Sequence, residues 1–229
     1  MSSQPILTVE KVQNREKWYQ TKHLLSRDDS SWIRIDTMPW GGTYKPVTLA
    51  AVGRDHSSLH LYMRSYEKKL RFKASRRNDP VCQDSCMEFF FSPMGPENPA
   101  YFNFEVNPLG VLYIGFSQNG TRSDSKQAAA HKENTYFNMK AMSRSQAEEY
   151  NRKNGENPEA FWDISYSIPF QFIQEYMPDF DPFQPGKRIS ANFYKCGDLT
   201  EIEHYVVWNC IESPKPDYHR PEFFGILEL

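Results

Sequence analysis

Apolar and polar residues alternate along most of this chain, which is the pattern of strands that bury one face. The alternating segments are short, and clusters of Gly, Pro, Asn, Asp and Ser separate them. The segments predicted as strands are 32–35, 47–52, 59–66, 87–91, 101–106, 111–116, 136–142, 162–168, 189–194, 205–208 and 223–229. Many short strands at this spacing are typical of a sandwich or barrel, and we expect an all-β, antiparallel β-sandwich.

The clearest local signal is a hairpin over residues 101–117, with a turn at Asn107-Pro108-Leu109-Gly110. Proline presets φ near −65° and glycine tolerates φ above zero, as such a turn requires. Two apolar sets flank the turn, each on one face of its strand: Phe102, Phe104 and Val106, then Leu112, Ile114 and Phe116. Both sets suit a core. The other face of the first strand is polar, with Tyr101, Asn103, Glu105 and Asn107.

Helical patterns are few. Residues 143–154 begin with serines suited to an N-cap and end at Gly155, which suits a helix end, so they predict a short helical insertion at the surface. Residues 170–177, between Pro169 and Pro178, allow one further short helix. No internal repeat or low-complexity linker divides the chain, and a single domain over residues 1–229 is expected.

The composition supports a packed, aromatic-rich domain. Hydrophobic residues make up 39% of the 229 residues and charged residues 24%, which is enough apolar material for a core. The aromatic share of 15% comes from 16 Phe, 13 Tyr and 5 Trp. Aromatic side chains favour strands, and they also provide flat faces that stack on sugars or bases. Composition therefore leaves sugar binding open without selecting it.

The charge and hydropathy of the chain argue against two classes of binding partner. The formal net charge is −2 and no basic stripe is present, so a nucleic-acid partner is not expected. Residues 64–77 are locally basic and are interpreted as a solvated loop. No apolar run approaches the roughly 18 residues that span a bilayer, so no membrane partner is expected. Residues 1–9 show no secretory signal, which predicts a cytoplasmic location unless a leader was trimmed. The oligomeric state stays open.

The four cysteines are Cys82, Cys86, Cys196 and Cys210. In a reducing compartment they are expected as free thiols. A zinc site normally has paired CxxC spacing, which these cysteines lack, so the favoured interpretation is that they act as small buried hydrophobes.

Three stretches in a fixed order carry a resemblance to a known family. The first is 80–91 (PVCQDSCMEFFF) with 101–107 (YFNFEVN) and Gly110. The second runs from Trp162-Asp163-Ile164 to Ile168-Pro169. The third comprises 192–196 (NFYKC), Trp208 and 219–225 (HRPEFFG). Together they resemble the family 9-like carbohydrate-binding modules, which are related to modules attached to some xylanases. The resemblance runs from about residue 47 to the C-terminus.

The resemblance implies a β-sandwich that binds glycan or sugar ends in polysaccharide metabolism, with bound calcium in some members. Glu88 matches the family's carboxylate that bonds sugar hydroxyls, and Trp208 matches one of its two aromatic platforms. Cys82 stands at the position of the other platform, and Glu105 replaces a basic residue of the family pattern. The expected ligand is therefore carbohydrate, although the family's way of sandwiching a disaccharide does not carry over intact.

A sugar site needs hydrogen-bonding side chains held on a rigid sheet beside an aromatic ring. Strand alternation allows such a set to meet on one open face. The predicted ligand-binding residues are Glu88, Asn103, Glu105, Asn192 and Trp208, with Tyr218, His219 and Arg220 at the rim. Structural interpretations stand beside these: the asparagines can satisfy backbone groups, the indole can belong to the core, and the Pro-rich loop can simply pack before the last strand.

Asp84 is a candidate calcium ligand, and the alternative is that it holds a loop at a sheet edge. Two other function classes remain. Glu88 and Glu105 could serve a glycoside hydrolase as acid and base, if they stood roughly 5–9.5 Å apart across a cleft. Haem binding through Met63, Met87 or His204 is a third hypothesis. No catalytic or phosphate-binding motif supports an enzyme, so non-catalytic carbohydrate binding is the leading prediction.

Overall fold

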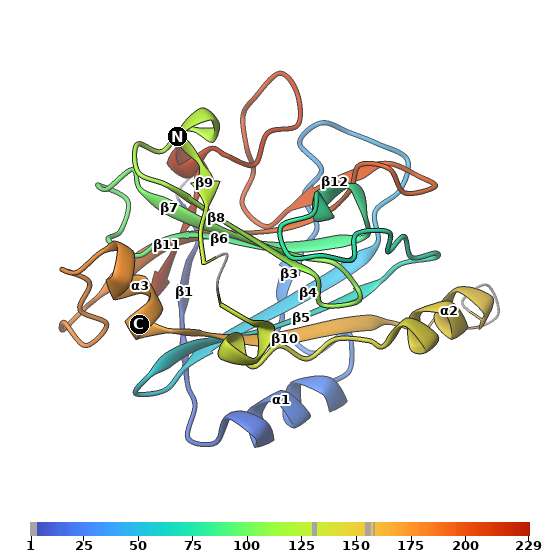
Figure 1. The fold of residues 1–229 in the computed structure, drawn as a ribbon, viewed down its shortest axis with the longest axis horizontal. Coiled ribbons are helices and arrows are strands. Elements are labelled where there is room, and N and C mark those ends of the chain that lie inside the picture. The colour runs from blue at the N-terminus through green and yellow to red at the C-terminus, as the bar shows by residue number, and fades with distance from the viewer. Residues whose placement is uncertain (1–3, 130–131, 154–156, 158) are drawn as a thin grey trace.

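Two stacked β-sheets form a sandwich (Figure 1). A computed structural model describes residues 4–129, 132–153, 157 and 159–229. Strands dominate these residues and the three α-helices are short, so the prediction of an all-β sandwich with a short helical insertion is confirmed.

The large sheet carries the polar face of the predicted hairpin. Its strand order is β1 (Ile6–Thr8), β13 (Gly225–Glu228), β11 (Arg188–Gly197), β6 (Cys86–Ser92), β7 (Tyr101–Val106), β8 (Leu112–Ser117) and β9 (Lys126–Gln127). β12 (His204–Val207) pairs with the C-terminal half of β11. It lies on the same side of β11 as β13, which pairs with the N-terminal half. Pairing is antiparallel except between β1 and β13.

The small sheet has the order β10 (Trp162–Pro169), β5 (Ser58–Tyr66), β4 (Val47–Arg54) and β2 (Glu10–Lys11), and β3 (Ile33–Ile35) also pairs with β4. The main core lies between the sheets. Phe104 of β7 stacks on Tyr166 of β10, with ring centroids 5.9 Å apart and planes at 10°. Both rings are fully buried, so aromatic side chains tie the two layers together.

The predicted hairpin is confirmed. Gly110 has φ +72° and donates its N–H to Asn107 O at 2.9 Å, which closes the turn. Both apolar sets point into the core between the sheets. The polar set of β7 therefore faces the outer side of the large sheet.

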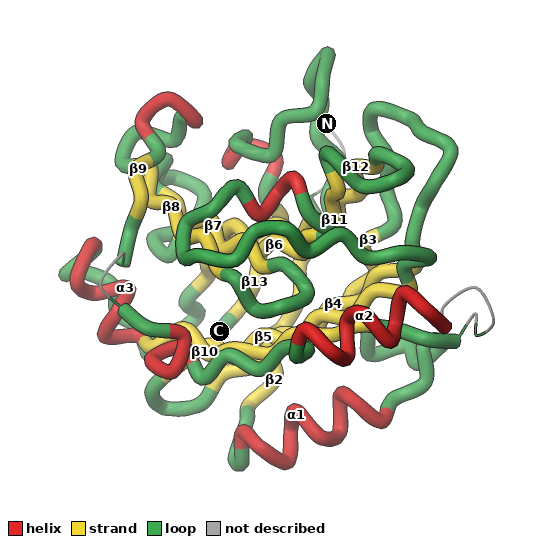
Figure 2. Tube along the Cα trace, turned by 45° about the vertical axis from the view of Figure 1, so that its right-hand side comes forward, coloured by secondary structure: helices red, strands yellow, loops and turns green. Residues whose placement is uncertain are grey.

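Three helices lie around the sandwich. α1 (Arg15–Leu24) lies against the outer face of the small sheet, where Tyr19 Oη donates to Tyr166 O at 2.7 Å (Figure 2). This helix was not predicted from the sequence. α2 (Arg144–Lys153) confirms the predicted insertion, whose last residue and Gly155 lie outside the described residues, and α3 (Phe170–Tyr176) confirms the second short helix.

The strand predicted over residues 136–142 is wrong. A 3₁₀-helix, Asn134–Phe137, occupies its first part and ends at Asn138, whose φ of +49° breaks an extended chain. Phe137 is buried against Phe104, at a centroid distance of 5.8 Å, so its apolar character reflects core packing and not strand alternation. Among the described residues, no helix combines the length and apolar character needed to cross a bilayer.

Candidate functional site

The outer face of the large sheet gathers most of the predicted binding residues. Glu88 on β6 lies directly opposite Glu105 on β7, and the next pair on the same face is Phe90 with Asn103. Asn192 on β11 lies opposite Phe90 and so shares this face. The strand register therefore places these side chains of β6, β7 and β11 on one face of the sheet, as the alternation in the sequence allowed.

This face is covered, so the expectation of an open face is wrong. Glu88 is 2% exposed and Asn103 is fully buried. The reason is the Pro-rich segment before β13, which folds back over the sheet: the Tyr218 ring stacks on Tyr194 of β11 with centroids 4.0 Å apart and planes at 4°. Ile211 and Phe224 from the same stretch join Tyr218 in a second apolar cluster on this side.

A cavity of about 270 Å³ remains between the sheet and the covering loops. Three aromatic rings line it, from Phe90, Tyr205 and Tyr218. Its charged and polar lining consists of Glu88, Glu105, Asp198, Asp217, Arg122 and His219, together with Cys82 and Cys196. The cavity therefore combines flat apolar surfaces with hydrogen-bonding groups of both kinds.

Three carboxyl groups of the cavity, those of Glu88, Glu105 and Asp198, hold their protons more tightly than usual. Burial, reinforced by the charge of Glu105, raises the pKa of Glu88 well above its ordinary value. Burial likewise raises the pKa of Glu105 to about 7 and raises the pKa of Asp198. Near neutral pH this wall can donate as well as accept hydrogen bonds, which matches the dual character of sugar hydroxyls.

Neighbouring side chains hold the lining in place. Asn103 Nδ2 donates to Glu105 Oε1 at 2.7 Å, so Asn103 orients the carboxyl and does not itself line the cavity. Gly115 on β8 makes room for it, because a Cβ at this position would lie 2.2 Å from Asn103 Oδ1. His219 Nδ1 lies 2.7 Å from Tyr101 Oη, and burial together with Arg122 lowers the pKa of His219 to about 4. The imidazole is therefore neutral at pH 7.

The placement of Trp208 beside Glu88 is wrong. Tyr194, which pairs with Glu88, pairs on its other side with Val207, so Trp208 alternates to the opposite face. There its ring contacts Phe193 of the core at a centroid distance of 5.7 Å. Trp208 therefore packs against the core, which was the structural alternative for this residue.

Asn192 and Arg220 also point elsewhere. Asn192 lies on the outer face, but its side-chain amide is hydrogen-bonded to the backbone of Asn209. Its Nδ2 donates to Asn209 O at 2.9 Å, and its Oδ1 accepts a hydrogen bond from Asn209 N at 2.9 Å. Arg220 Nε donates to Glu222 Oε1 at 2.7 Å and its guanidinium lies over Phe223. Neither side chain lines the cavity, because each satisfies a local structural partner.

Several lining residues were not predicted, namely Arg122, Asp198, Tyr205 and Asp217, and neither was Trp40, which contacts two of the lining rings. Trp40 contacts both Tyr205 and Tyr218, with centroids 6.3 and 5.9 Å away, and its Nε1 donates to Ser213 O. Tyr205 lies in the short strand β12, whereas the other four residues lie outside the strands, where period-two alternation carries no information. The one available signal was Asp217, which adjoins the predicted Tyr218 and His219.

Asp84 does not suit calcium. Its carboxylate is fully buried and accepts hydrogen bonds from Arg71 Nη1, Lys73 N, Ala74 N and Asn107 Nδ2. Protein donors therefore occupy the oxygens that a calcium ion would need, and the guanidinium supplies the compensating charge. These contacts favour the alternative, that Asp84 holds the loop ahead of β6 against the hairpin turn.

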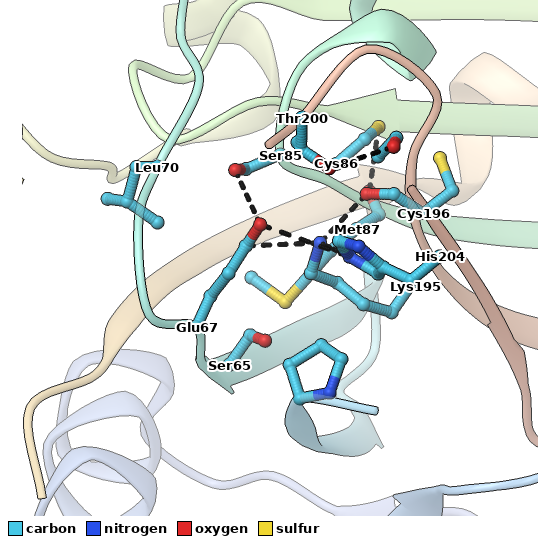
Figure 3. Close-up of polar contacts among 12 residues, drawn as sticks. Ser65, Glu67, Leu70, Ser85, Cys86, Met87, Lys195, Cys196, Thr200 and His204 are labelled. Atoms are coloured by element: carbon cyan, nitrogen blue, oxygen red, sulfur yellow. Dashed lines mark hydrogen bonds and ion pairs between the residues drawn. The ribbon is translucent and has the colours of Figure 1, made fainter. Parts of the chain in front are cut away.

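A buried ionic cluster lies on the inner side of β11 (Figure 3). Lys195 Nζ contacts Glu67 Oε2 at 3.1 Å and donates to His204 Nε2 and Cys196 O, each at 2.8 Å. Glu67 also accepts from Ser85 Oγ at 2.8 Å and from Trp162 Nε1 at 3.2 Å. The three donors of the ammonium each have a partner, so the cluster joins the two sheets as a structural element.

The haem hypothesis gains no support from this environment. Met63 and Met87 are fully buried in the core between the sheets. His204 accepts from Lys195, and its Nδ1 lies 2.8 Å from Ile202 O. All three side chains are committed to packing or to the cluster.

The geometry also disfavours the hydrolase hypothesis. Glu88 and Glu105 are paired residues on adjacent strands and stand side by side on one wall of the cavity. A glycosidase instead places its two carboxyl groups on opposite sides of the scissile bond.

A larger hollow of about 600 Å³ lies between α1 and β10, on the other side of the molecule. Its ionisable groups are paired with one another: His23 Nδ1 lies 2.7 Å from Asp163 Oδ2, which also accepts from Tyr62 Oη. We therefore place the candidate site at the smaller cavity, where aromatic, acidic and basic side chains all face the same space.

Comparison with known proteins agrees with this architecture. The sequence profile described as carbohydrate-binding family 9 matches residues 19–229. None of the curated proteins matched the sequence.

Solved structures also resemble the chain. A putative carbohydrate-binding protein from Bacteroides uniformis ATCC 8492 is 25% identical with a TM-score of 0.74, and the match covers 99% of both chains. Two structures of a family 9 carbohydrate-binding module from Caldicellulosiruptor kristjanssonii, in complex with glucose and with cellotriose, are each 10% identical. Their TM-scores are 0.57 and 0.59, with 98% of this chain and 95% and 93% of theirs covered, so they support the shared fold. On the profile match over most of its length, this chain belongs to carbohydrate-binding family 9.

Proposed function

We propose that this chain binds carbohydrate without catalysis, in the cavity between the outer face of the large sheet and the Pro-rich loop. The observation that carries the proposal is the convergence of three aromatic rings, buried carboxyl groups and the Arg122 guanidinium on one small space, in a chain of carbohydrate-binding family 9. Sugars present hydroxyls that need both donors and acceptors, and C–H patches that lie against rings.

The size of the cavity defines the part of a glycan that it accepts. A volume of about 270 Å³ lies at the small end of ligand pockets and matches one sugar ring. We infer that the cavity takes a terminal sugar residue, with Glu88 and Glu105 bonding its hydroxyls and Tyr205 against its C–H face. Tyr218 and His219 complete the wall. The structures with glucose and with cellotriose identify the first ligands to test.

The direct test is isothermal titration of the purified chain with glucose, cellotriose and a panel of other mono- and oligosaccharides, with and without calcium. We expect saturable binding of at least one sugar, and a matching rise in melting temperature, because ligand that binds only the folded state stabilises it. No binding to any sugar of a broad panel, in either condition, would overturn the proposal.

Replacing Arg122 with alanine should weaken sugar binding by about 10–100-fold, because hydrogen bonds to charged groups contribute about 1.5–3 kcal/mol. Arg122 is exposed, so its loss should leave the melting temperature nearly unchanged. The matched control is Arg220→Ala, since Arg220 bonds Glu222 outside the cavity and its loss should leave affinity intact. Equal affinities for the two variants in the same titration would remove Arg122 from the site.

Tyr205→Ala should lower sugar affinity by about 5–10-fold, since an aromatic stacking contact contributes on the order of 1 kcal/mol. Trp208→Ala is the contrasting variant: it should lower the free energy of unfolding by roughly 2–3 kcal/mol and leave affinity unchanged, because its ring packs on the core side of the sheet. Urea unfolding and titration of both proteins check the two effects. A binding loss in Trp208→Ala with normal stability would contradict the assignment of faces.

A further inference from the structure

Two cysteines and a carboxyl group meet beside the floor of the cavity. Cys86 on β6 and Cys196 on β11 are directly opposite each other in the antiparallel pair. Glu88 lies two residues after Cys86 and so projects from the same face. Within the described parts of the chain, one set of three potential metal-ligating side chains has its ligand atoms within 4.8 Å of one another, and it consists of these residues.

The three side chains already contact each other. Cys196 Sγ donates to Glu88 Oε1 at 3.0 Å, and the hydrogen bond between the Cys86 and Cys196 side chains, followed by burial, raises the pKa of the Cys196 thiol. Each residue is at most 2% exposed, so all three are held by packing at the end of the β6–β11 pair. Glu88 and Cys196 also line the cavity, which opens a path for a small ion to reach them.

We propose that Cys86, Cys196 and Glu88 bind one zinc ion at the floor of the cavity. Two sulfur atoms and one carboxylate oxygen form a donor set that zinc accepts, whereas calcium and magnesium require oxygen ligands throughout. The three-ligand arrangement leaves the fourth tetrahedral position toward the cavity, as in zinc sites that keep an open position. This set could not be recognised from the spacing of the cysteines in the sequence, because its members come from two strands far apart in the chain.

The distances are compatible with tetrahedral coordination. With Zn–S bonds of about 2.3 Å and a Zn–O bond of about 2.1 Å, tetrahedral ligand atoms lie roughly 3.5–3.8 Å apart. The 3.0 Å contact between Cys196 and Glu88 therefore has to open by about half an ångström, which a side-chain rotation supplies. Each thiol and the Glu88 carboxyl release their protons to solvent on binding, and the ion replaces the hydrogen bond that now joins Cys196 to Glu88.

Titration of the full chain with Co²⁺ and Zn²⁺, under a non-thiol reductant, tests this site. We expect the absorption of tetrahedral Co²⁺–thiolate coordination to saturate at one ion per chain and to be displaced by Zn²⁺. Cys196→Ser and Cys86→Ser should each weaken binding by more than about 100-fold, since even changes to groups behind a ligand cost 10–100-fold. Glu88→Gln should weaken binding and retain the thiolate absorption.

The chain offers a matched control. Cys210 is exposed and lies outside the three-residue set, so Cys210→Ser should bind both metals as the wild type does. Alkylation of the folded wild type, mapped by mass spectrometry, decides the matter if the cysteine variants fail to fold: zinc should slow the modification of Cys86 and Cys196 and leave Cys210 unaffected.

Absence of thiolate absorption in the reduced wild type, or its loss in Cys210→Ser with retention in Cys196→Ser, would overturn the proposal. Sugar titrations on the same zinc-free samples keep this outcome separate from the proposed function. Sugar binding without metal binding refutes the zinc site alone.

Discussion

Replacing Lys195 with methionine should destabilise the protein by about 3–5 kcal/mol, because it leaves the Glu67 carboxylate buried without its cation. The ammonium is fully buried and contacts Glu67, His204 and the Cys196 carbonyl. Methionine fills a similar volume, so the loss reports the charge and the hydrogen bonds and not a cavity. Chemical denaturation followed by tryptophan fluorescence measures the change.

Lys187→Met is the matched control. Lys187 lies just before β11 and is also largely buried, but its Nζ lies over the Phe180 ring, 5.3 Å from the centroid. Such a contact contributes about 1 kcal/mol, so Lys187→Met should lose much less stability than Lys195→Met. The double variant Lys195→Met, Glu67→Gln removes both charges and should be more stable than Lys195→Met alone. A loss below about 1 kcal/mol for Lys195→Met, or a double variant less stable than the single, would show that the cluster does not join the sheets.

Protein stability should fall as pH rises between about 5 and 8, and Glu105→Gln should remove much of this decline. The folded-state pKa of Glu105 is about 7, raised from 4.5 mainly by burial. A folded state that holds a proton more tightly than the unfolded chain is favoured at low pH. The stabilisation is complete below pH 4.5 and is lost as pH rises through 7, with a size on the order of 3 kcal/mol.

Denaturation curves at several pH values measure this effect. Glutamine keeps the acceptor for Asn103 Nδ2 but cannot ionise, so the variant should be more stable than the wild type at pH 8. Glu97→Gln is the control, because it removes the same charge from an exposed position and should leave the pH profile unchanged. A wild type whose stability rises between pH 5 and 8 would contradict the burial of the Glu88–Glu105 pair.

Period-two alternation predicted most of the fold. β7 was predicted over 101–106 and spans Tyr101–Val106, because its apolar and polar residues alternate without interruption. β1, β2 and β9 were missed because two or three residues are too few to show a period. α1 was missed because it buries little beyond Tyr19 and Lys22 and therefore shows no apolar stripe.

The site was harder to predict because it depends on register. Alternation correctly put His204, Val206 and Trp208 on one side of their strand, but only the pairing of Tyr194 with Val207 decides which side of the sheet that is. Lys195 gave a usable signal, since it has the same phase on β11 as the buried Phe193 and therefore demands a buried partner. Arg122, Asp198 and Tyr205 reach the cavity through tertiary packing of segments far apart in sequence.

The central claim is that the cavity beneath the Pro-rich loop holds a sugar. A crystal structure of the chain soaked with cellotriose tests it most directly. We expect one terminal glucose ring in the cavity, with its hydroxyls within hydrogen-bonding distance of Glu88, Glu105 or Arg122. Cellotriose bound on another face of the sandwich, with this cavity empty, would contradict it.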